Sequence, residues 1–511
     1  MFDCGDASMK RISVTRLGAG PFLALSCALP TLCVASAYRL GPVDDAVLVN
    51  PSPTTSVNFG VAMAAGDFND DNIRDLAVAS LAASEVHVYF GVEWLVGGVL
   101  PANRFTPMVV PLPAEVFNPV LAAGDFDDDG DDELVIGDPG FDGTAANAGR
   151  VLVLRYTGSS WVTQETIEQG ADGYAGGAES GDELGASLAV GDFDNDGYAD
   201  LAIGADHEDV GSVQDSGAVL IAYGSSTGIT GARDRLVTRN DDGLTVPPTI
   251  VELYGATLAS GDFNEDGYDD LAIGAPRARC PNGTDSSGAV IMMLGSASGI
   301  VNTGTRQFRP GVLGVQGSCT DNITFGHTLA AGGFDAGSSS DLAIATSNDA
   351  VHVLYGSAVT GLQTDGDQRI TPASLPGNVV GDSRFGISLA AGRFNDDPFN
   401  IFPGRSSLAI GAQFDTVNGL IKAGSVNVVP GSSSGLEPSK AQRFVRSAGL
   451  AIGPPATLDL LGTAMAGGDF NDDGYRDHAI GVPYYDIAGF ADRGAVEILY
   501  SSDFIFRNAF Q

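Results

Sequence analysis

The chain has 511 residues, with 64 acidic and 26 basic side chains, and a net charge of −38. This balance argues against nucleic acid or an anionic membrane as the main partner, because we expect no basic patch that would neutralise phosphates. It favours solubility and cationic partners.

The first 37 residues have the features of a secretory signal peptide. Lys10, Arg11 and Arg16 precede an uncharged, mostly apolar stretch over 17–37, which ends in Ala35-Ser36-Ala37. Basic residues, an apolar run and a small-x-small cleavage site are typical of such signals. We therefore predict cleavage after Ala37 and an exported protein that is secreted, periplasmic or held at the cell surface.

The alternative is an uncleaved membrane anchor. Gly18, Gly20, Pro21 and Pro30 interrupt the apolar stretch and favour cleavage. No later segment has the 18 or more consecutive apolar residues that a transmembrane helix needs. The sequence therefore predicts a mature chain over 38–511 without a stable membrane span.

One nine-residue acidic loop recurs seven times along the mature chain. Five copies are intact, at 67–75, 125–133, 192–200, 262–270 and 469–477, and two eroded copies start at Gly333 and Arg393. The starts are 58 (67 to 125) to 76 (393 to 469) residues apart. A repeat of nearly constant period indicates an architecture of similar units.

The spacing within the loop predicts calcium. Ca²⁺ takes six to eight oxygen ligands from carboxylates, Asn side chains and carbonyls. Acids or Asn stand at positions 1, 3, 5 and 9, and a Gly or Asn at position 6 permits the sharp turn. Together with position 7, the predicted ligands of about five Ca²⁺ ions are Asp67, Asn69, Asp71, Ile73, Asp75, Asp125, Asp127, Asp129, Asp131, Glu133, Asp192, Asp194, Asp196, Tyr198, Asp200, Asp262, Asn264, Asp266, Tyr268, Asp270, Asp469, Asn471, Asp473, Tyr475 and Asp477. A solvated acidic turn without metal is the alternative.

The loops are flanked by short apolar runs bounded by Gly, such as Leu188-Ala-Val190 and Leu201-Ala-Ile203. These runs indicate buried strands rather than the helices of an EF-hand. A third run follows in each unit, as in Gly217-Ala-Val-Leu-Ile-Ala-Tyr223, and a variable segment holds a fourth. Seven units of about four strands predict an all-β fold, a seven-bladed β-propeller of four-stranded antiparallel blades.

Phe-Gly pairs at 59–60, 325–326 and 385–386, and the later Gly274-Ala275-Pro276, Gly411-Ala412 and Gly481-Val482-Pro483, resemble FG-GAP repeats. These repeats build the N-terminal propeller of integrin α-subunits and many proteins exported by bacteria. The resemblance implies a single propeller over 38–511, with calcium loops on one rim and ligands on the other. Unit 2 departs from it with Asn118-Pro119, and Gly333 and Arg393 replace the first acid, so we predict no calcium in those two loops.

The closure of the ring has two candidates. Propellers commonly close by pairing both chain ends within one blade. Tyr38-Arg-Leu40 or Ala46-Val-Leu-Val49 is expected to add the outer strand to unit 7, and the tail Phe504-Ile-Phe506 competes for that place.

Cysteine use agrees with export. Cys280 and Cys319 are the only cysteines of the predicted mature chain, and a lone pair in an exported protein suggests one disulfide. In the FG-GAP arrangement the loops that carry them emerge on the same face, which implies that they are bonded. Two buried thiols are the alternative.

We find no catalytic motif, and therefore do not expect an enzyme. His87 and His352 occupy equivalent positions in third strands, which indicates packing. His207 lies in an acidic loop that is either a metal or substrate site or a solvated run of charges. The resemblance implies a monomeric recognition or adhesion module for an extracellular protein or glycan, and the alternative is a secreted polysaccharide lyase or hydrolase. Its ligand-face candidates are Tyr174, His207, Arg277, Arg279, Tyr484 and Tyr485.

Overall fold

The computed structural model describes residues 46–500, apart from 51–57, 93–106, 245–247, 281–285, 313, 320–322, 359, 378, 380–381, 394–404, 447–454, 473 and 487–490. The chain separates into two units, Met1–Gly41 and Pro42–Gln511, and the described residues belong to the second. The predicted leader over 1–37 and the closing candidates 38–40 and 504–506 lie outside them.

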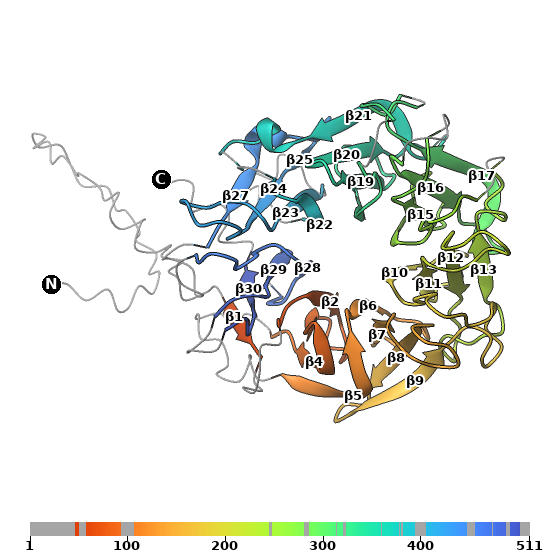
Figure 1. The fold of residues 1–511 in the computed structure, drawn as a ribbon. Helices are drawn as coiled ribbons and strands as arrows, with labels where there is room; N and C mark the ends of the chain where they lie inside the picture. Colours follow the sequence, from red (N-terminus) through yellow and green to blue (C-terminus); the bar gives the residue numbers. More distant parts are fainter. Residues whose placement is uncertain are drawn as a thin grey trace, which may run out of the picture. The chain divides into compact units, whose positions relative to one another are not determined.

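Seven four-stranded antiparallel sheets follow one another around a ring (Figure 1). Blade 1 consists of β2 (Ala62–Gly66), β3 (Asp75–Ala79), β4 (Ala82–Tyr89) and β5 (Met108–Phe117). Blade 2 consists of β6 (Val120–Gly124), β7 (Glu133–Asp138), β8 (Arg150–Tyr156) and β9 (Trp161–Ile167). Blade 3 consists of β10 (Ser187–Gly191), β11 (Asp200–Ala205), β12 (Ala218–Ala222) and β13 (Arg235–Thr238). The predicted seven-bladed propeller is confirmed.

The remaining blades repeat this plan. Blade 4 consists of β14 (Thr257–Gly261), β15 (Asp270–Ala275), β16 (Ala289–Leu294) and β17 (Val301–Phe308). Blade 5 consists of β18 (Leu329–Gly332), β19 (Asp341–Thr346), β20 (Ala350–Tyr355) and β21 (Gln363–Ile370). Blade 6 consists of β22 (Phe385–Gly392), β23 (Ser407–Ala412), β24 (Ser425–Val429) and β27 (Gln442–Phe444), with a small hairpin of β25 (Gly431–Ser432) and β26 (Gly435–Leu436).

Blade 7 draws its strands from both ends of the chain. Its order is β1 (Ala46–Val49), β30 (Ala495–Leu499), β29 (Asp477–Val482) and β28 (Met465–Gly468), with β1 outermost. The innermost strands β28 and β2 are in contact, as are those of the other neighbouring blades. The N-terminal candidate over 46–49 therefore closes the ring.

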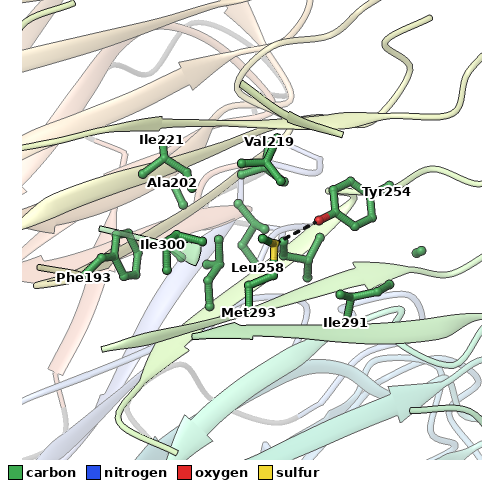
Figure 2. Close-up of a cluster of buried hydrophobic side chains, with 14 of the residues drawn as sticks. Phe193, Ala202, Val219, Ile221, Tyr254, Leu258, Ile291, Met293 and Ile300 are labelled. Atoms are coloured by element: carbon green, nitrogen blue, oxygen red, sulfur yellow. Dashed lines mark hydrogen bonds between the residues drawn. The ribbon is translucent and has the colours of Figure 1, made fainter. Parts of the chain in front are cut away.

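The hydrophobic core is divided among the seven junctions between blades. In β11, Leu201 and Ile203 pack against blade 2, whereas Ala202 packs against blade 4. Successive side chains of a strand point to opposite faces, so a strand between two neighbours is buried on both. Figure 2 shows the junction of blades 3 and 4, where Phe193 and Ile221 pack near Met293. Every blade therefore depends on both of its neighbours for burial.

Helical structure is minimal in the described part of the chain. It consists of two short 3-10 turns, η1 (Pro372–Ser374) and η2 (Pro438–Lys440). Within the described ranges, no helix has the length and apolar character required to span a bilayer.

The Phe-Gly and Gly-Ala signatures meet where blades touch. The N–H of Gly255 donates to the carbonyl of Gly274 within blade 4 at 3.0 Å. The carbonyl of Gly255 in turn lies against Gly204 of blade 3, only 2.2 Å from where a Cβ on Gly204 would stand. Gly137 and Gly481 lie equally close to the Phe-Gly-type glycines of the following blades. The motif is therefore a backbone-to-backbone contact between blades.

Substituting Gly204 is expected to destabilise the fold strongly. In Gly204→Ala the new methyl group would overlap the backbone oxygen of Gly255, which cannot rotate away. Overpacking of this kind costs about 3 kcal/mol of unfolding free energy. A Cβ added at Gly177 would stand in open space, so Gly177→Ala is the control. Equal urea midpoints for the two variants would contradict this account.

Candidate metal centres

Each acidic loop joins the first and second strands of its blade. Because the blades are alike in direction, all of these loops lie at one end of the ring, which we call the acidic rim. The strand 2–3 loops and the connections between blades lie at the opposite end, which we call the variable rim. The predicted calcium ligands and the predicted ligand face are therefore on opposite rims.

The first acid of each loop holds the turn. In the third loop the Asp192 carboxylate accepts the backbone N–H groups of Asp196 and Gly197, both at 3.1 Å. Asp196 then accepts the N–H of Tyr198 at 3.2 Å. The fourth loop repeats these bonds around Asp262, at 3.1 and 3.0 Å. The spacing of the acids thus satisfies backbone donors that the tight turn would leave unpaired.

The sixth position has the left-handed conformation that the sequence predicts. Gly197 has φ of 95°, and Asn72, which replaces Gly in the first loop, has φ of 63°. The fourth position also has positive φ, as at Asn195 (51°) and Glu265 (59°). The sequence predictions did not include this second left-handed residue, although four of the five intact loops have Asp or Asn there, which tolerate the conformation better than most residues.

The ninth acid is buried and links the loop to the rest of its blade. Asp200 accepts the N–H of Phe193 at 2.8 Å through one oxygen and that of Gly224 at 2.9 Å through the other. In the eroded fifth loop, Asp341 makes the same two bonds, to Phe334 and Gly356. The ninth carboxylate therefore has a structural function that does not depend on the first acid.

In the second and third loops, carboxylate oxygens converge, and some of them have no hydrogen-bond donor. The ligand oxygens of Asp192, Asp194 and Asp200 lie within 4.8 Å of one another, as do those of Asp125, Asp127 and Glu133. Four buried oxygens in these loops have no hydrogen-bond partner: Asp127 Oδ1, Asp131 Oδ1, Glu133 Oε1 and Asp194 Oδ1. Buried anionic oxygens are costly unless a cation or donor meets them, so the donor set fits a hard divalent ion.

The electrostatics of the loops favour the same conclusion. Burial, opposed by backbone hydrogen bonds and reinforced by neighbouring acids, raises the pKa of Asp75 to about 8 and that of Asp200 to about 7. Burial likewise raises the pKa of Glu133 to about 8. A carboxylate in such surroundings is more stable protonated or beside a cation than as a free anion.

Arginine side chains flank both clusters. In the second loop, Arg155 pairs with Asp129 and lies 3.5 Å from Asp127 Oδ2. In the third loop, Arg233 pairs with Asp194 and lies 3.5 Å from Asp196 Oδ2. The side chains of Arg155 and Arg233 are 39% and 49% exposed. They stand at the edge of the clusters, where they can move aside for an ion.

The other predicted ligands form smaller acidic groups. Asn69, Asn264 and Asn471 occupy the third position of their loops, so fewer carboxylates converge there. In the fourth loop Asn264 donates to Asp266 at 2.9 Å. Asp473 lies outside the described residues. At the fifth position, Asp71 and Asp266 accept the N–H of residue 7 at 2.9 and 3.1 Å.

Neighbouring loops are linked to one another by the eighth residue. The N–H of Ala199 donates to the carbonyl of Asp125 at 3.0 Å, and that of Asp269 donates to Asp192 at 3.0 Å. The same bond joins Ser340 to Asp262 and Ser406 to Gly333. It does not depend on side chains, so it persists in the eroded loops. The acidic rim is therefore a chain of coupled loops, which no local sequence pattern predicts.

The side chain at position 8 adds to this coupling in two places. Asp132 accepts the N–H of Asp67 at 2.8 Å and also pairs with Arg74. Asp269 accepts the N–H of Asp192 at 3.1 Å. Each of these two acids belongs to one loop and accepts a hydrogen bond from the preceding loop.

The two eroded loops are the fifth and the sixth, and the structure describes the whole of the fifth. In the fifth loop the first position is Gly333, which has no carboxylate. Asp335 accepts the N–H of Gly337 at 2.6 Å, and Asp341 accepts the N–H of Phe334. In the sixth loop, residues 394–404 lie outside the described residues. The expected absence of calcium from both stays a prediction.

The variable rim carries the disulfide. Cys280 and Cys319 are bonded, with a Cα–Cα distance of 5.9 Å. The bond joins the strand 2–3 loop of blade 4 to the connection between blades 4 and 5.

One ligand-face candidate is wrong. Tyr174 is 3% exposed and belongs to the core between blades 2 and 3, where its hydroxyl donates to Glu165 at 3.3 Å. Tyr485 stacks beneath Arg446, whereas Tyr484 is 37% exposed.

His87 and His352 are buried and pack edge-on against Phe59 and Phe325, as predicted.

His207 belongs to a small group on the variable rim. Its Nδ1 lies 3.0 Å from Asp206 Oδ1 and 3.6 Å from Glu183 Oε2. The hydrogen bond to Asp206 raises the pKa of His207 despite partial burial. The structure thus adds Glu183, from the preceding connection, to the acidic run.

Comparison with known proteins identifies the repeats. The FG-GAP repeat family matches residues 117–154, 184–221, 254–291 and 461–499. These segments coincide with the first three strands of blades 2, 3, 4 and 7.

Several known proteins are similar in sequence to parts of the chain. It is 30% identical to integrin alpha-PS2 of Drosophila melanogaster over 242 residues, which are 44% of this chain and 16% of that protein. It is 29% identical to integrin alpha-5 of Xenopus laevis, over 42% of this chain and 20% of that protein. Phosphatidylinositol-glycan-specific phospholipase D of Mus musculus is 31% identical over 34% of this chain and 19% of that protein. The chain spans no more than a fifth of the length of these three relatives.

Proposed function

Because the chain is a seven-bladed β-propeller of FG-GAP repeats, we propose that it is an exported, calcium-bound module that recognises an extracellular protein or glycan. Calcium occupies the acidic rim and stabilises the scaffold. The ligand is held on the variable rim. The protein acts by binding and carries out no reaction.

The observation that carries the calcium assignment is the set of four buried carboxylate oxygens without partners in the second and third loops. Asp125, Asp127 and Glu133 hold one ion, and Asp192, Asp194 and Asp200 hold another. The first, fourth and seventh loops take further ions with Asn in the third position. Calcium supplies charge neutralisation and cross-linking of each loop, and the chain's own residues supply its oxygen cage.

The recognition assignment rests on the contrast between the rims. The acidic rim repeats one set of hydrogen bonds from blade to blade, whereas the loops of the variable rim differ in length and residues. Variable loops on a rigid scaffold are where binding specificity usually lies. The likeness to integrin alpha chains agrees with an adhesive function. Export follows from the predicted leader.

The likeness to phosphatidylinositol-glycan-specific phospholipase D does not extend to an activity. The match covers 19% of that protein. A polysaccharide lyase or hydrolase would need a convergent acid and base on the variable rim, and a shared propeller does not supply one.

The proposal predicts calcium-dependent binding. The full chain, probed on an array of glycans and extracellular-matrix proteins, is expected to bind at least one ligand in calcium and to lose most of that binding in EDTA. EDTA removes the ions that hold the blades in register. A folded, calcium-loaded protein that binds nothing on the array would contradict the recognition function.

A further inference from the structure

Four exposed arginines on the variable rim have no acidic partner among the described residues. Arg277, Arg279, Arg369 and Arg384 are exposed, and none forms an ion pair with a described carboxylate. Acidic side chains outnumber basic ones by 64 to 26. Elsewhere, arginines such as Arg150 and Arg443 are paired with Asp138 and Asp415. These four guanidinium groups gather on blades 4 and 5 and the entry to blade 6.

The arginines line three adjoining hollows. The first, about 450 Å³, is lined by Arg277, Arg279 and Thr324, among others. The second, about 340 Å³, includes Ser318, Asn348 and Arg369. The third, about 320 Å³, includes His327, Ser347 and Arg384.

These hollows follow one another across the rim. Thr346 lines both the second and the third, and Ile323 of the second is next in sequence to Thr324 of the first. We call the series the basic groove. Asp382, in the third hollow, is the one carboxylate among its described lining residues.

The basic groove is braced by bonds between elements. The Cys280–Cys319 disulfide joins the residues that follow Arg279 and Ser318. Arg309, which is buried, donates to the carbonyl of Arg279. Asp367 accepts the N–H of Gln316 at 2.5 Å. A preformed groove loses less entropy when a ligand binds.

The third hollow is braced by stacking. The guanidinium of Arg384 lies 4.6 Å above the centre of the Phe414 ring, and Lys422 lies 4.0 Å from the same ring. A stacked guanidinium keeps its edge donors free for a ligand. The positive charge of this hollow is therefore held at a fixed place.

The lining chemistry indicates the ligand. Guanidinium groups bind carboxylates through paired hydrogen bonds, and the Ser, Thr and Asn side chains match sugar hydroxyls. Protein interfaces favour exposed Trp and Tyr anchors, and the described lining residues include none. The field of the chain is strongly negative, but it is screened within about 8 Å at physiological salt. A ligand with widely spaced carboxylates can therefore enter the groove. A nucleic acid carries one charge per about 1.7 Å, so the negative field of the chain repels it more strongly.

We infer that the basic groove binds an acidic glycan, a sugar chain with carboxylates on separate residues. This inference rests on the proposed recognition function and names its surface and ligand class. It also corrects the expectation that the protein lacks a basic surface. Arg369 and Arg384 bind carboxylates, and the hydroxyl and amide side chains between them bind the sugar.

The test uses the calcium-loaded full chain and hyaluronate, which carries one carboxylate per disaccharide. Calorimetry is expected to show binding to hyaluronate and none to neutral dextran. The double variant Arg369→Gln/Arg384→Gln should bind hyaluronate at least about tenfold more weakly, because it loses two charge-assisted hydrogen-bonding groups. The control Arg393→Gln/Arg476→Gln changes the net charge equally on the acidic rim, where both side chains are exposed. Its affinity should stay within about twofold.

Three results would overturn the inference. They are no binding to hyaluronate, equal affinities of the two double variants, or tighter binding to poly-glutamate than to hyaluronate. A calcium-dependent protein or neutral-glycan ligand from the array that the Arg369→Gln/Arg384→Gln variant binds normally would leave the recognition function standing and discard the groove as its site.

Discussion

Removal of calcium is expected to lower the melting temperature of the protein by on the order of 10 °C. Extracellular calcium sites typically have Kd values of about 0.1–1 mM. At a tenfold excess of calcium each site adds about 1.4 kcal/mol of stability, or about 7 kcal/mol for five independent sites. The effect should spread around the ring, because backbone bonds such as that from Ala199 to Asp125 connect the loops.

Metal analysis separates calcium from a general effect of EDTA. Dialysed protein is expected to hold close to five ions. Asp194→Asn removes an oxygen cluster of the third loop and should lose one ion and several degrees of melting temperature. Asp335→Asn changes the equivalent third position of the eroded fifth loop and should change neither. A wild-type content near zero, or the same loss for both variants, would contradict the assignment.

Deletion of residues 38–50 is expected to destabilise the ring as much as the loss of several core residues. These residues include β1, whose pairing with β30 runs from Ala46↔Ile498 to Val49↔Ala495. Leu48 is 1% exposed and belongs to the core shared by blades 7 and 1. The hydroxyl of Tyr89, on blade 1, donates to the carbonyl of Val49 at 3.3 Å. The deletion therefore removes the outer strand of blade 7 together with its contacts to blade 1.

Point variants isolate the contribution of packing. Leu48→Ala should cost about 2–5 kcal/mol of unfolding free energy. Val49→Thr, at a side chain that is 36% exposed, should cost less than about 0.5 kcal/mol. Thermal and urea unfolding of the three variants would measure this. An unchanged melting temperature after the deletion would mean that β1 does not close the ring.

Local chemistry made the acidic loops and the blade count predictable. The turn of the third loop depends on Asp192 and on donors four and five residues later, and such contacts are visible in a sequence. The continuous apolar run of β11 predicts a strand that is buried on both faces in the same way. Repetition of these short patterns indicated the number of blades.

The ninth acid and the loop-to-loop bonds required the tertiary structure. Asp200 is bonded to Gly224, 24 residues away, and Asp269 is bonded to the N–H of Asp192, 77 residues away. Tyr174 looked like a ligand-face residue because its segment is polar, yet its ring fills the junction between blades 2 and 3. One side chain of a polar loop can be buried in the core, and no local sequence pattern shows which side chain it is.

By itself the sequence determined the repeat, the blade number, the left-handed sixth residue and the oxygen-rich loops, because each depends on residues a few positions apart. Only the tertiary structure decided that β1 closes the ring and that Arg277, Arg369 and Arg384 line one groove. The physical reason is that both depend on which distant segments become neighbours. That outcome is set by the packing of all seven blades together, whereas the turns and strands are set within each one.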